Sequence, residues 1–372
     1  RLAAQGDIWK NGGNVSRVAI VGAGMMGSAM AWPLSDNGHD VRLVGTHLDR
    51  DIVQSCRRNG WHPTLSRPLP PRVTPFFLED IEIALQGVEF VIQGVSSPGV
   101  PWAAAMLGRC LTPGVPVLAV TKGLALTNQG ELQTLPDLFD SLLPDRLRGR
   151  VPLAAIAGPC IAGELAGRRP SCVVFAGRDA DLLHRLAANL QTDAYRVWTS
   201  LDVAGVETCA ALKNSYVLGI SLAMGLLEAQ GGVDGAGAHS YNLEAALFAQ
   251  ASLEIRRMVA LMGGNPDLAA GLPGVGDLYV TTRGGRTVRL GTLLGQGLPL
   301  QQALLRLSGV TLESVENIRV MAPALPALER AGKLRAGELP LMRQLCRIVV
   351  EGAPVRLPLD EFYAAHGFSR PI

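Results

Sequence analysis

The sequence lacks the cysteine patterns that mark disulfide frameworks and metal sites. Its six cysteines form no C-x-x-C pair and no metal-like cluster with histidine. We therefore predict reduced, mostly buried thiols and no bound metal. An excess of charge of one sign is also absent, because 34 basic and 32 acidic residues leave a net charge of +2. No nucleic-acid partner is expected, and any anionic ligand must be bound by local groups.

An apolar run of membrane-spanning length and the apolar core of a signal peptide are missing as well. The sequence thus predicts a cytoplasmic protein without stable membrane insertion. Residues 1–14 are polar and begin without Met, so we expect a leader or cloning remnant and a native start near Val15. A length of 372 residues favours two domains, which we place at 15–202 and 203–372.

The first domain opens with a strand, a glycine-rich turn and a helix. The β-branched run Arg17–Val21 is followed at once by Gly22, Gly24 and Gly27 in a G-x-G-x-x-G pattern. Gly22 permits the tight turn, Gly24 lets a pyrophosphate approach the backbone, and Gly27 permits close packing of helix on strand. The helix N-terminus then faces the phosphates. This order of elements favours a dinucleotide site over a simple glycine-rich turn.

The end of the second strand, Asp40–Val44, bears on the choice of cofactor. In NAD enzymes this strand usually ends in an acid that binds the ribose hydroxyls. Here Gly45 and Thr46 occupy that end, and no carboxylate follows until Asp49. Arg50 and His47 are placed to face a 2′-phosphate, which favours NADP over NAD. The alternative is that both are solvated loop residues.

Three further apolar runs, 88–95, 115–120 and 151–156, alternate with helical segments. This pattern predicts an α/β protein with a Rossmann-type doubly wound parallel sheet. Lys122 and Gly158 follow two of these strands, at the sheet edge where such folds bind ligands. Lys122 is placed to hold a phosphate or polarise a carbonyl, unless it is simply an exposed loop residue.

The second half changes to Ala- and Leu-rich segments, which predict an all-α C-terminal domain. Its first helix is apolar on every face yet contains Lys213 and Asn214, with no carboxylate three or four residues from Lys213. Burial lowers the pKa of a lysine, which suits it to proton transfer near neutral pH. The alternative is a lysine that extends to the surface at a helix edge.

A glycine-dense segment lies farther along this half, over residues 271–291. Its glycines indicate backbone held close to a ligand or another element. Within it, Arg286 offers a planar guanidinium for a phosphate, and Asp277 is a natural counter-charge for Lys213. An ordinary surface loop with solvated charges is the other interpretation.

Taken in order, these motifs resemble the NAD(P)-dependent glycerol-3-phosphate dehydrogenases. The resemblance covers residues 15 to about 360. It depends on GAGMMG, TKG (121–123), GPCIAGE (158–164), ALKN (211–214), GVGDL (274–278) and GGRTxRxG (284–291). GTHLD at 45–49 and HP at 62–63 look most like the archaeal-type branch.

The resemblance implies a hydride transfer between the nicotinamide and C2 of dihydroxyacetone phosphate, with Lys213 as general acid/base. Lys122 and Asp277 would complete the catalytic group. Residues implied to bind substrate are Asn214, Thr281, Arg286, Thr287, Gly158 and Cys160. Residues implied to bind NADP or NAD are Gly22, Gly24, Met25, Met26, Gly27, Thr46, Lys122, Ala162, Arg286 and Glu313.

Three departures from the family pattern affect specificity. Thr287 stands where the family usually has Asn, Ser96-Ser97-Pro98 replaces a common Val-Pro-Ser/Thr turn, and Thr46 replaces a frequent Arg. A related dehydrogenase of another small phosphorylated or carboxylated hydroxy compound, like ketopantoate reductase, is therefore the alternative. A non-catalytic NADP-sensing protein is the third hypothesis. The apolar helical half also predicts a homodimer.

Overall fold

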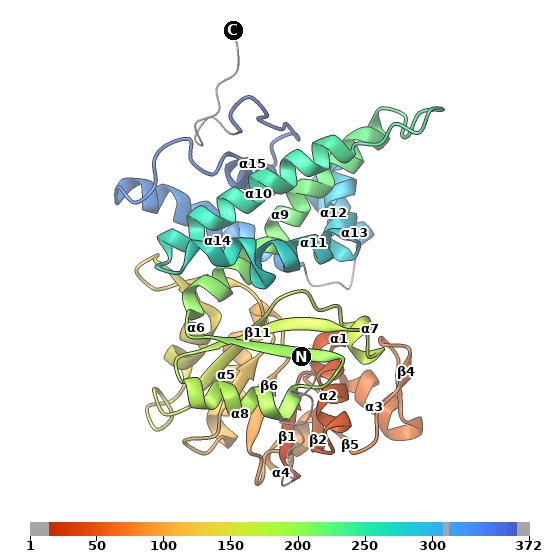
Figure 1. The fold of residues 1–372 in the computed structure, drawn as a ribbon, viewed down its shortest axis with the longest axis vertical. Coiled ribbons are helices and arrows are strands. Elements are labelled where there is room, and N and C mark those ends of the chain that lie inside the picture. The colour runs from red at the N-terminus through yellow and green to blue at the C-terminus, as the bar shows by residue number, and fades with distance from the viewer. Residues whose placement is uncertain (1–14, 308–311, 363–372) are drawn as a thin grey trace, which may run out of the picture.

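A computed structural model of the chain describes residues 15–307 and 312–362, so the expected leader over residues 1–14 lies outside the described part. A β-sheet unit and a helical unit are stacked along the long axis of the molecule (Figure 1). The sheet unit contains residues 17–200, and the helices of the other unit run from residue 203 to residue 349. The predicted site residues therefore come from both units.

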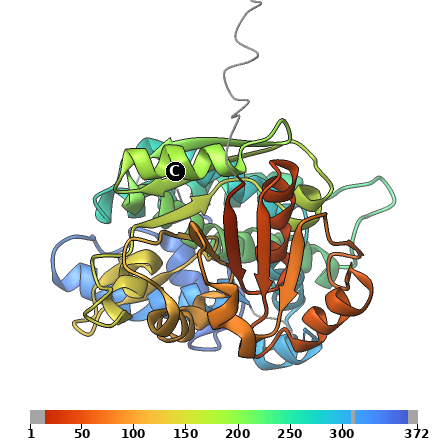
Figure 2. The same ribbon diagram turned by 90° about the horizontal axis from the view of Figure 1, so that it is seen from below.

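Within the described residues, the main sheet has eight strands in the order β12-β11-β10-β7-β6-β1-β2-β5. Its strands are β1 (Arg17–Val21), β2 (Asp40–Val44), β5 (Val73–Phe76), β6 (Phe90–Gln93), β7 (Val117–Ala119), β10 (Leu153–Ala157), β11 (Ser171–Gly177) and β12 (Tyr195–Ser200). Figure 2 shows β1, β2 and β5, coloured red to orange, side by side. The predicted doubly wound α/β sheet is confirmed.

Alternate residues of the buried strands serve two different hydrophobic cores. In β1, Val18 and Ile20 face one core, whereas Ala19 and Val21 face the other. The first core is covered by α1 (Met25–Ala29), α2 (Ala31–Asp36), α3 (Arg50–Asn59), α7 (Ala162–Ala166) and α8 (Ala180–Leu190). The second is covered by α4 (Ile81–Ala84), α5 (Val100–Cys110) and α6 (Leu135–Leu142). Short elements complete the unit: β3 (Trp61–His62), β4 (Arg67–Pro68), η1 (Leu78–Asp80) and η2 (Ser97–Gly99).

The sheet is not parallel throughout, which differs from the sequence prediction. β11 pairs with β10 in the antiparallel direction, and β12 then runs parallel to β11. The connection from β10 to β11 contains only the five-residue helix α7, about 7.5 Å long. A helix this short does not return the chain along a five-residue strand of about 16 Å. β11 therefore starts from the edge at which β10 ends.

A single long helix, α9 (Val203–Ala229), forms the centre of the helical unit. Around it lie α10 (Tyr241–Leu261), η3 (Pro266–Ala270), η4 (Leu272–Gly276), α11 (Asp277–Thr282), α12 (Arg286–Gly295), α13 (Leu300–Arg306), α14 (Glu313–Arg330) and α15 (Pro340–Val349). By length and composition α9 is apolar enough to cross a membrane, which the sequence analysis did not anticipate. In the structure 83% of its apolar window is buried, so α9 is a core helix.

Glycines allow the backbone of α12 to pack directly against the backbone of α9. A Cβ atom added at Gly291 would lie 2.5 Å from the carbonyl oxygen of Leu218 and 2.6 Å from Cβ of Ser221. Gly295 is equally enclosed by the backbone around Gly225. This close packing brings Arg286, at the start of α12, next to the middle of α9.

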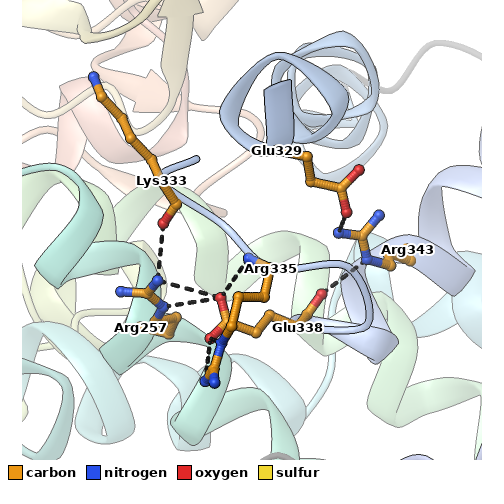
Figure 3. A network of polar contacts seen from close by, with 6 residues as sticks. All are labelled: Arg257, Glu329, Lys333, Arg335, Glu338 and Arg343. Atoms are coloured by element: carbon orange, nitrogen blue, oxygen red, sulfur yellow. Dashed lines mark hydrogen bonds and ion pairs between the residues drawn. The ribbon is translucent and has the colours of Figure 1, made fainter. Parts of the chain in front are cut away.

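A polar network fixes the connection between α14 and α15 (Figure 3). Arg257 of α10 and Arg335 both pair with Glu338, at 3.2 and 2.9 Å. Arg343 of α15 pairs with Glu329 of α14. Because most of these groups are partly exposed, each pair contributes at most about 1 kcal/mol. The network thus orients the connecting segment rather than supplying most of its stability.

Helix α9 also buries a carboxyl group. Glu207 is 0% exposed, and neither side-chain oxygen has a hydrogen-bond partner in the described part of the chain. Burial raises the pKa of Glu207 to about 8, against the opposing attraction of Lys122. Glu207 is therefore protonated in the folded protein at neutral pH.

Replacing Glu207 with Gln is expected to reduce the pH dependence of stability. The pKa of Glu207 is higher in the folded state than in the unfolded chain, so its stabilising contribution is complete at acidic pH. It is then lost at roughly 1.4 kcal/mol per pH unit as the pH rises toward 8. In denaturant melts, the free energy of unfolding of Glu207→Gln relative to the wild type should increase by roughly 2–4 kcal/mol between about pH 5 and about pH 8.

The exposed Glu131 provides the control for this measurement. Its side chain is solvated in the folded and the unfolded protein, so Glu131→Gln should leave the pH dependence of stability unchanged. A stability difference between Glu207→Gln and wild type that is the same at both pH values would show that Glu207 is ionised in the folded protein.

Candidate active site

A cavity of about 590 Å³ lies between the sheet unit and the helical unit. It is placed at the carboxyl ends of β1, β6, β7 and β10, and the helical unit contributes α9, α11, α12 and α14. Its lining consists of Gly24, Met25, Met26, Gly94, Val95, Ser96, Val120, Thr121, Lys122, Cys160, Ala162, Lys213, Asn214, Thr281, Gly284, Gly285, Arg286, Thr287 and Glu313. A second cavity of about 620 Å³, beside the network of Figure 3, contains none of the predicted site residues.

The glycine-rich turn after β1 forms one wall of the first cavity. Gly22 has a φ of +114°, and a Cβ atom there would lie 2.6 Å from the carbonyl oxygen of Gly94. Gly27 packs closely against the carbonyl group of Gly22. Neither of these two residues lines the cavity. A Cβ atom at Gly24 would meet nothing within 4 Å. The open face at Gly24, at the start of α1, fits the pyrophosphate of a dinucleotide.

Two buried polar side chains hold this turn in place. The Asp49 carboxylate accepts hydrogen bonds from the backbone N–H of Ala23 at 3.1 Å and of Thr46 at 2.8 Å. It also accepts the Thr46 hydroxyl at 2.8 Å. On the other side, Nε2 of His62 lies 2.8 Å from the Ser28 hydroxyl and 3.1 Å from the Ala23 carbonyl. Thr46 therefore braces the loop and is not part of the cavity lining.

The Arg50 side chain lies beyond this loop, at the end of β2 where a 2′-phosphate is expected. Its side chain is 66% exposed, and its guanidinium pairs with Glu79 at 2.6 Å and stacks over Phe77 at 5.0 Å. Arg57 contacts the same ring at 4.9 Å. The ring of His47, in contrast, lies 5.5 Å from that of Trp102. Arg50 is thus held at the surface by exposed partners, whereas His47 packs beside Trp102.

The innermost feature of the site is a carboxylate between two ammonium groups. Asp277, at the start of α11, is 0% exposed, and its Oδ1 accepts a hydrogen bond from Lys213. Its Oδ2 accepts one from Lys122 at 2.7 Å and one from the Gly158 N–H at 3.2 Å. Lys213 and Lys122 line the cavity, whereas Asp277 and Gly158 lie behind them. The structure thereby joins residues that are 64 and 155 positions apart in the sequence.

Burial and like charge act differently on the two lysines. Desolvation and the neighbouring Lys122 charge outweigh the attraction of Asp277 and lower the pKa of Lys213 to about 8. For Lys122, burial also opposes the charged form, but the Asp277 charge outweighs it and raises the pKa. Burial is likewise outweighed at Asp277, whose pKa the two ammonium groups lower. Lys213 is therefore the member of this group that exchanges a proton near neutral pH.

Polar groups from α9, α11, α12 and α14 surround Lys213. Its ammonium donates to the Thr281 hydroxyl at 3.2 Å, while the neighbouring Asn214 amide donates to Glu313 at 2.9 Å. Burial raises the pKa of Glu313, although Lys213, Lys122 and Arg286 oppose the shift. Arg286 and Thr287 line the same wall, and the Thr287 hydroxyl lies 3.5 Å from that of Ser314.

The segment after β10 supplies the opposite wall through Cys160 and Ala162. Burial raises the pKa of the Cys160 thiol to about 11, with nearby Lys122 opposing the shift. The thiol is therefore protonated at neutral pH and is no nucleophile. Cys160 thus shapes the cavity without adding charge.

The choice between lysine and arginine in the sequence is a further signal for this site. The chain has four lysines, at positions 10, 122, 213 and 333, against 30 arginines. Two of the four meet at Asp277. Arginine stays charged at any physiological pH, whereas lysine changes its pKa readily when buried. The rare lysines of an arginine-rich chain are therefore candidates for positions that arginine cannot serve.

Comparison with known proteins finds matches to both halves of the chain. The family model described as NAD-dependent glycerol-3-phosphate dehydrogenase N-terminus matches residues 17–183, and the model of its C-terminus matches residues 202–360. An NADP(+)-dependent glycerol-3-phosphate dehydrogenase of Archaeoglobus fulgidus is 34% identical over 344 residues, covering 92% of this chain and 98% of that protein. A glycerol-3-phosphate dehydrogenase [NAD(P)+] of Desulfitobacterium hafniense is 33% identical, covering 92% and 89%.

A solved structure extends the match to three dimensions. The crystal structure of glycerol-3-phosphate dehydrogenase from Coxiella burnetii superposes with a TM-score of 0.77 at 26% identity, covering 95% of this chain and 99% of that chain. The matches cover both halves of the chain and include the residues around Asp277. The chain belongs to the NAD-dependent glycerol-3-phosphate dehydrogenase family.

Proposed function

We propose that this protein interconverts dihydroxyacetone phosphate and sn-glycerol 3-phosphate with NADP or NAD. The observation that carries the proposal is the buried Lys213–Asp277–Lys122 group, which faces a cavity bounded by the glycine-rich turn. Residues 15–202 would bind the dinucleotide, and residues 203–372 would provide the substrate and catalytic domain. A cytoplasmic location and a homodimer belong to the same proposal.

Lys213 would act as the general acid and base of the reaction. When bound, the nicotinamide supplies the hydride that adds to the C2 carbonyl carbon of dihydroxyacetone phosphate. The carbonyl oxygen becomes an alkoxide, and the Lys213 ammonium gives it a proton, which forms the hydroxyl of glycerol 3-phosphate. In the reverse direction neutral Lys213 takes the proton from that hydroxyl. A pKa of about 8 lets Lys213 serve both directions near neutral pH.

Lys122 would act as a fixed charge beside the reacting oxygen. With its pKa raised by Asp277, Lys122 stays protonated while Lys213 exchanges its proton. Its charge stabilises a developing alkoxide, and the effect is strong because the site is shielded from water. Asp277 would hold both ammonium groups in place and balance one of their two charges.

The remaining lining residues would position the substrate and cofactor. Arg286, which lines the cavity, would bind the substrate phosphate, and Asn214, Thr281, Thr287, Gly158 and Cys160 would surround the same space. Gly22, Gly24, Met25, Met26, Gly27, Thr46, Ala162 and Glu313 would form or support the cofactor side.

Reduction of dihydroxyacetone phosphate by NADPH and by NADH tests the proposal directly. Turnover, followed by the absorbance of the reduced nicotinamide, would support the activity and rank the cofactors. Cofactor binding without turnover would overturn it. A panel of phosphorylated and carboxylated ketones, including ketopantoate, would then separate a related dehydrogenase from a non-catalytic NADP-binding protein.

Lys213→Ala is expected to lower kcat for dihydroxyacetone phosphate reduction by about 10²- to 10⁴-fold, because the proton donor is lost. Cofactor affinity, measured by quenching of NADPH fluorescence, should stay near the wild-type value. In the wild type, reduction should slow as the pH rises above about 8, because Lys213 then loses its proton.

Lys333 gives the control for this change, since it is exposed and lies outside the cavity lining. Lys333→Ala should retain wild-type kcat. If Lys213→Ala were as active as Lys333→Ala, Lys213 would not be the proton donor.

Arg50→Ala is expected to raise the KM for NADPH about tenfold or more and to leave the KM for NADH nearly unchanged. The reason is that only NADPH carries a 2′-phosphate that can form a charge-assisted pair with the guanidinium. Steady-state kinetics with both cofactors measures the effect.

Arg57→Ala is the matched control, because Arg57 stacks on the same Phe77 ring. It should change neither KM more than about twofold, because Arg57 lies about 10 Å farther along α3 from the end of β2 than Arg50 does. An equal rise in the KM for NADPH and for NADH in Arg50→Ala would mean that Arg50 supports the loop and does not bind the 2′-phosphate.

A further inference from the structure

The loop that carries Lys122 belongs to the sheet unit in sequence but is anchored in the helical unit. Directly after the loop, β8 (Leu124–Leu126) and β9 (Leu132–Thr134) form a hairpin. Leu124 is 4% exposed and lies in the hydrophobic core of the helical unit, against which Leu132 also packs. Displacing this loop would therefore pull Leu124 out of that core.

Asn317 of α14 connects this anchor to the helix that carries Lys213. Its side-chain Oδ1 accepts the backbone N–H of Leu124 at 3.2 Å, and its Nδ2 donates to the backbone carbonyl of Ala211 at 2.9 Å. Leu124 is two residues beyond Lys122, and Ala211 is two residues before Lys213. Asn317 is only 2% exposed, so water does not replace these bonds at low cost.

The loop also packs tightly against the same amide. A Cβ atom added at Gly123 would lie 3.2 Å from Oδ1 of Asn317 and 3.1 Å from Cδ1 of Leu135. It would also lie 3.2 Å from Cβ of Ser97. The backbone next to Lys122 is thus enclosed on several sides, and its position depends on the side chain of Asn317.

We propose that Asn317 is a positioning residue that sets the separation of Lys122 and Lys213, so that both ammonium groups share Asp277. This inference rests on the proposed function for its kinetic consequences. An amide suits the role because it presents one acceptor and one donor in opposite directions. Neither a carboxylate nor an apolar side chain satisfies both the Leu124 N–H and the Ala211 carbonyl.

The electrostatics of the site give this role a measurable signature. The charged and titratable groups around Lys213 include Asp277 of α11, Lys122 after β7, Glu313 of α14, Arg286 of α12 and Cys160 after β10. Lys122 lowers the pKa of Lys213, and Asp277 raises it. If the loop withdraws Lys122, the lowering effect weakens and Asp277 attracts Lys213 alone. The pKa of Lys213 then rises above its value of about 8.

The first test is kinetic, with Asn317→Leu, which keeps the side-chain size but removes both hydrogen bonds. We expect kcat for dihydroxyacetone phosphate reduction to fall about 10- to 100-fold, because Lys122 is misplaced by a fraction of an ångström or more. The KM for substrate should change less than about threefold, since Arg286 on α12 is not moved. The alkaline decline in kcat should shift to higher pH.

Gln250 provides a control for the loss of a buried amide. It belongs to α10, is 1% exposed, donates to Glu254 and lines the second cavity rather than the one that contains Lys213. Gln250→Leu should lower the melting temperature as Asn317→Leu does, yet leave kcat and the pH profile unchanged. The same loss of stability with no change in kcat or pH profile for Asn317→Leu would overturn the proposal.

The second test is independent of catalysis. Because the chain has four lysines, protein labelled with ¹³C-lysine gives few NMR signals, and Lys333→Arg helps to assign them. The titration midpoint of Lys213 should rise in Asn317→Leu. It should also rise in Gly123→Ala, which pushes the same loop away from Asn317 and remains informative if Asn317→Leu does not fold.

The kinetic test and the lysine titration distinguish a failure of the proposed function from a failure of the positioning role. A wild-type protein that does not reduce dihydroxyacetone phosphate would remove the proposed function, while the lysine titration would still test the positioning role. An unchanged Lys213 midpoint in both variants would overturn that role, even if the wild type is fully active.

Discussion

The buried carboxylate of Asp277 is the interaction on which the site depends. Two ammonium groups and a backbone N–H converge on it in a place where an unpaired charge would be strongly destabilising. With one acid and two bases, the group carries a net positive charge when both lysines are protonated. That charge faces a cavity whose proposed occupants are a phosphate ester, a dinucleotide and a developing alkoxide. The folded protein thus holds a positive field in place before any ligand arrives, and this is the preorganisation that favours an anionic transition state.

Holding this group requires both halves of the chain, which explains why its members are so far apart in sequence. Lys213 comes from the central core helix, Asp277 from the start of α11 after a π-type turn, and Lys122 from a loop after β7. The β8–β9 hairpin and Asn317 then tie that loop to the helical core. A motion that opened the cleft by separating the two units would therefore have to break the Lys122–Asp277 pair or move Lys122 with the helical unit. The anchoring of Leu124 favours the second.

The local parts of this arrangement could be predicted from the sequence. β1, the glycine-rich turn and the apolar helix around Lys213 each follow from short-range patterns of residue type and spacing. The reversed direction of β11 could not, because it depends on the length of α7 relative to a strand. The hydrogen bonds of Asp49 to the glycine-rich turn and of Asn317 to Leu124 could not be predicted either. An Asp or Asn side chain can form hydrogen bonds equally well with many backbone groups. The partner of Lys213 was named as Asp277 from charge alone, but its sharing with Lys122 needed the three-dimensional structure.

The use of lysine at two positions in a chain of 30 arginines has a physical reason at each. At position 213 the group must both give and take a proton, which a guanidinium cannot do near neutral pH. At position 122 a permanent charge would suffice, and arginine would supply one. A guanidinium, however, brings five N–H donors in a rigid plane, and the space beside Asp277 and Lys213 offers acceptors for few of them. The compact ammonium leaves fewer donors unsatisfied and fits the remaining Oδ2 of Asp277. Steric and hydrogen-bonding limits therefore select lysine at position 122, whereas proton exchange selects it at position 213.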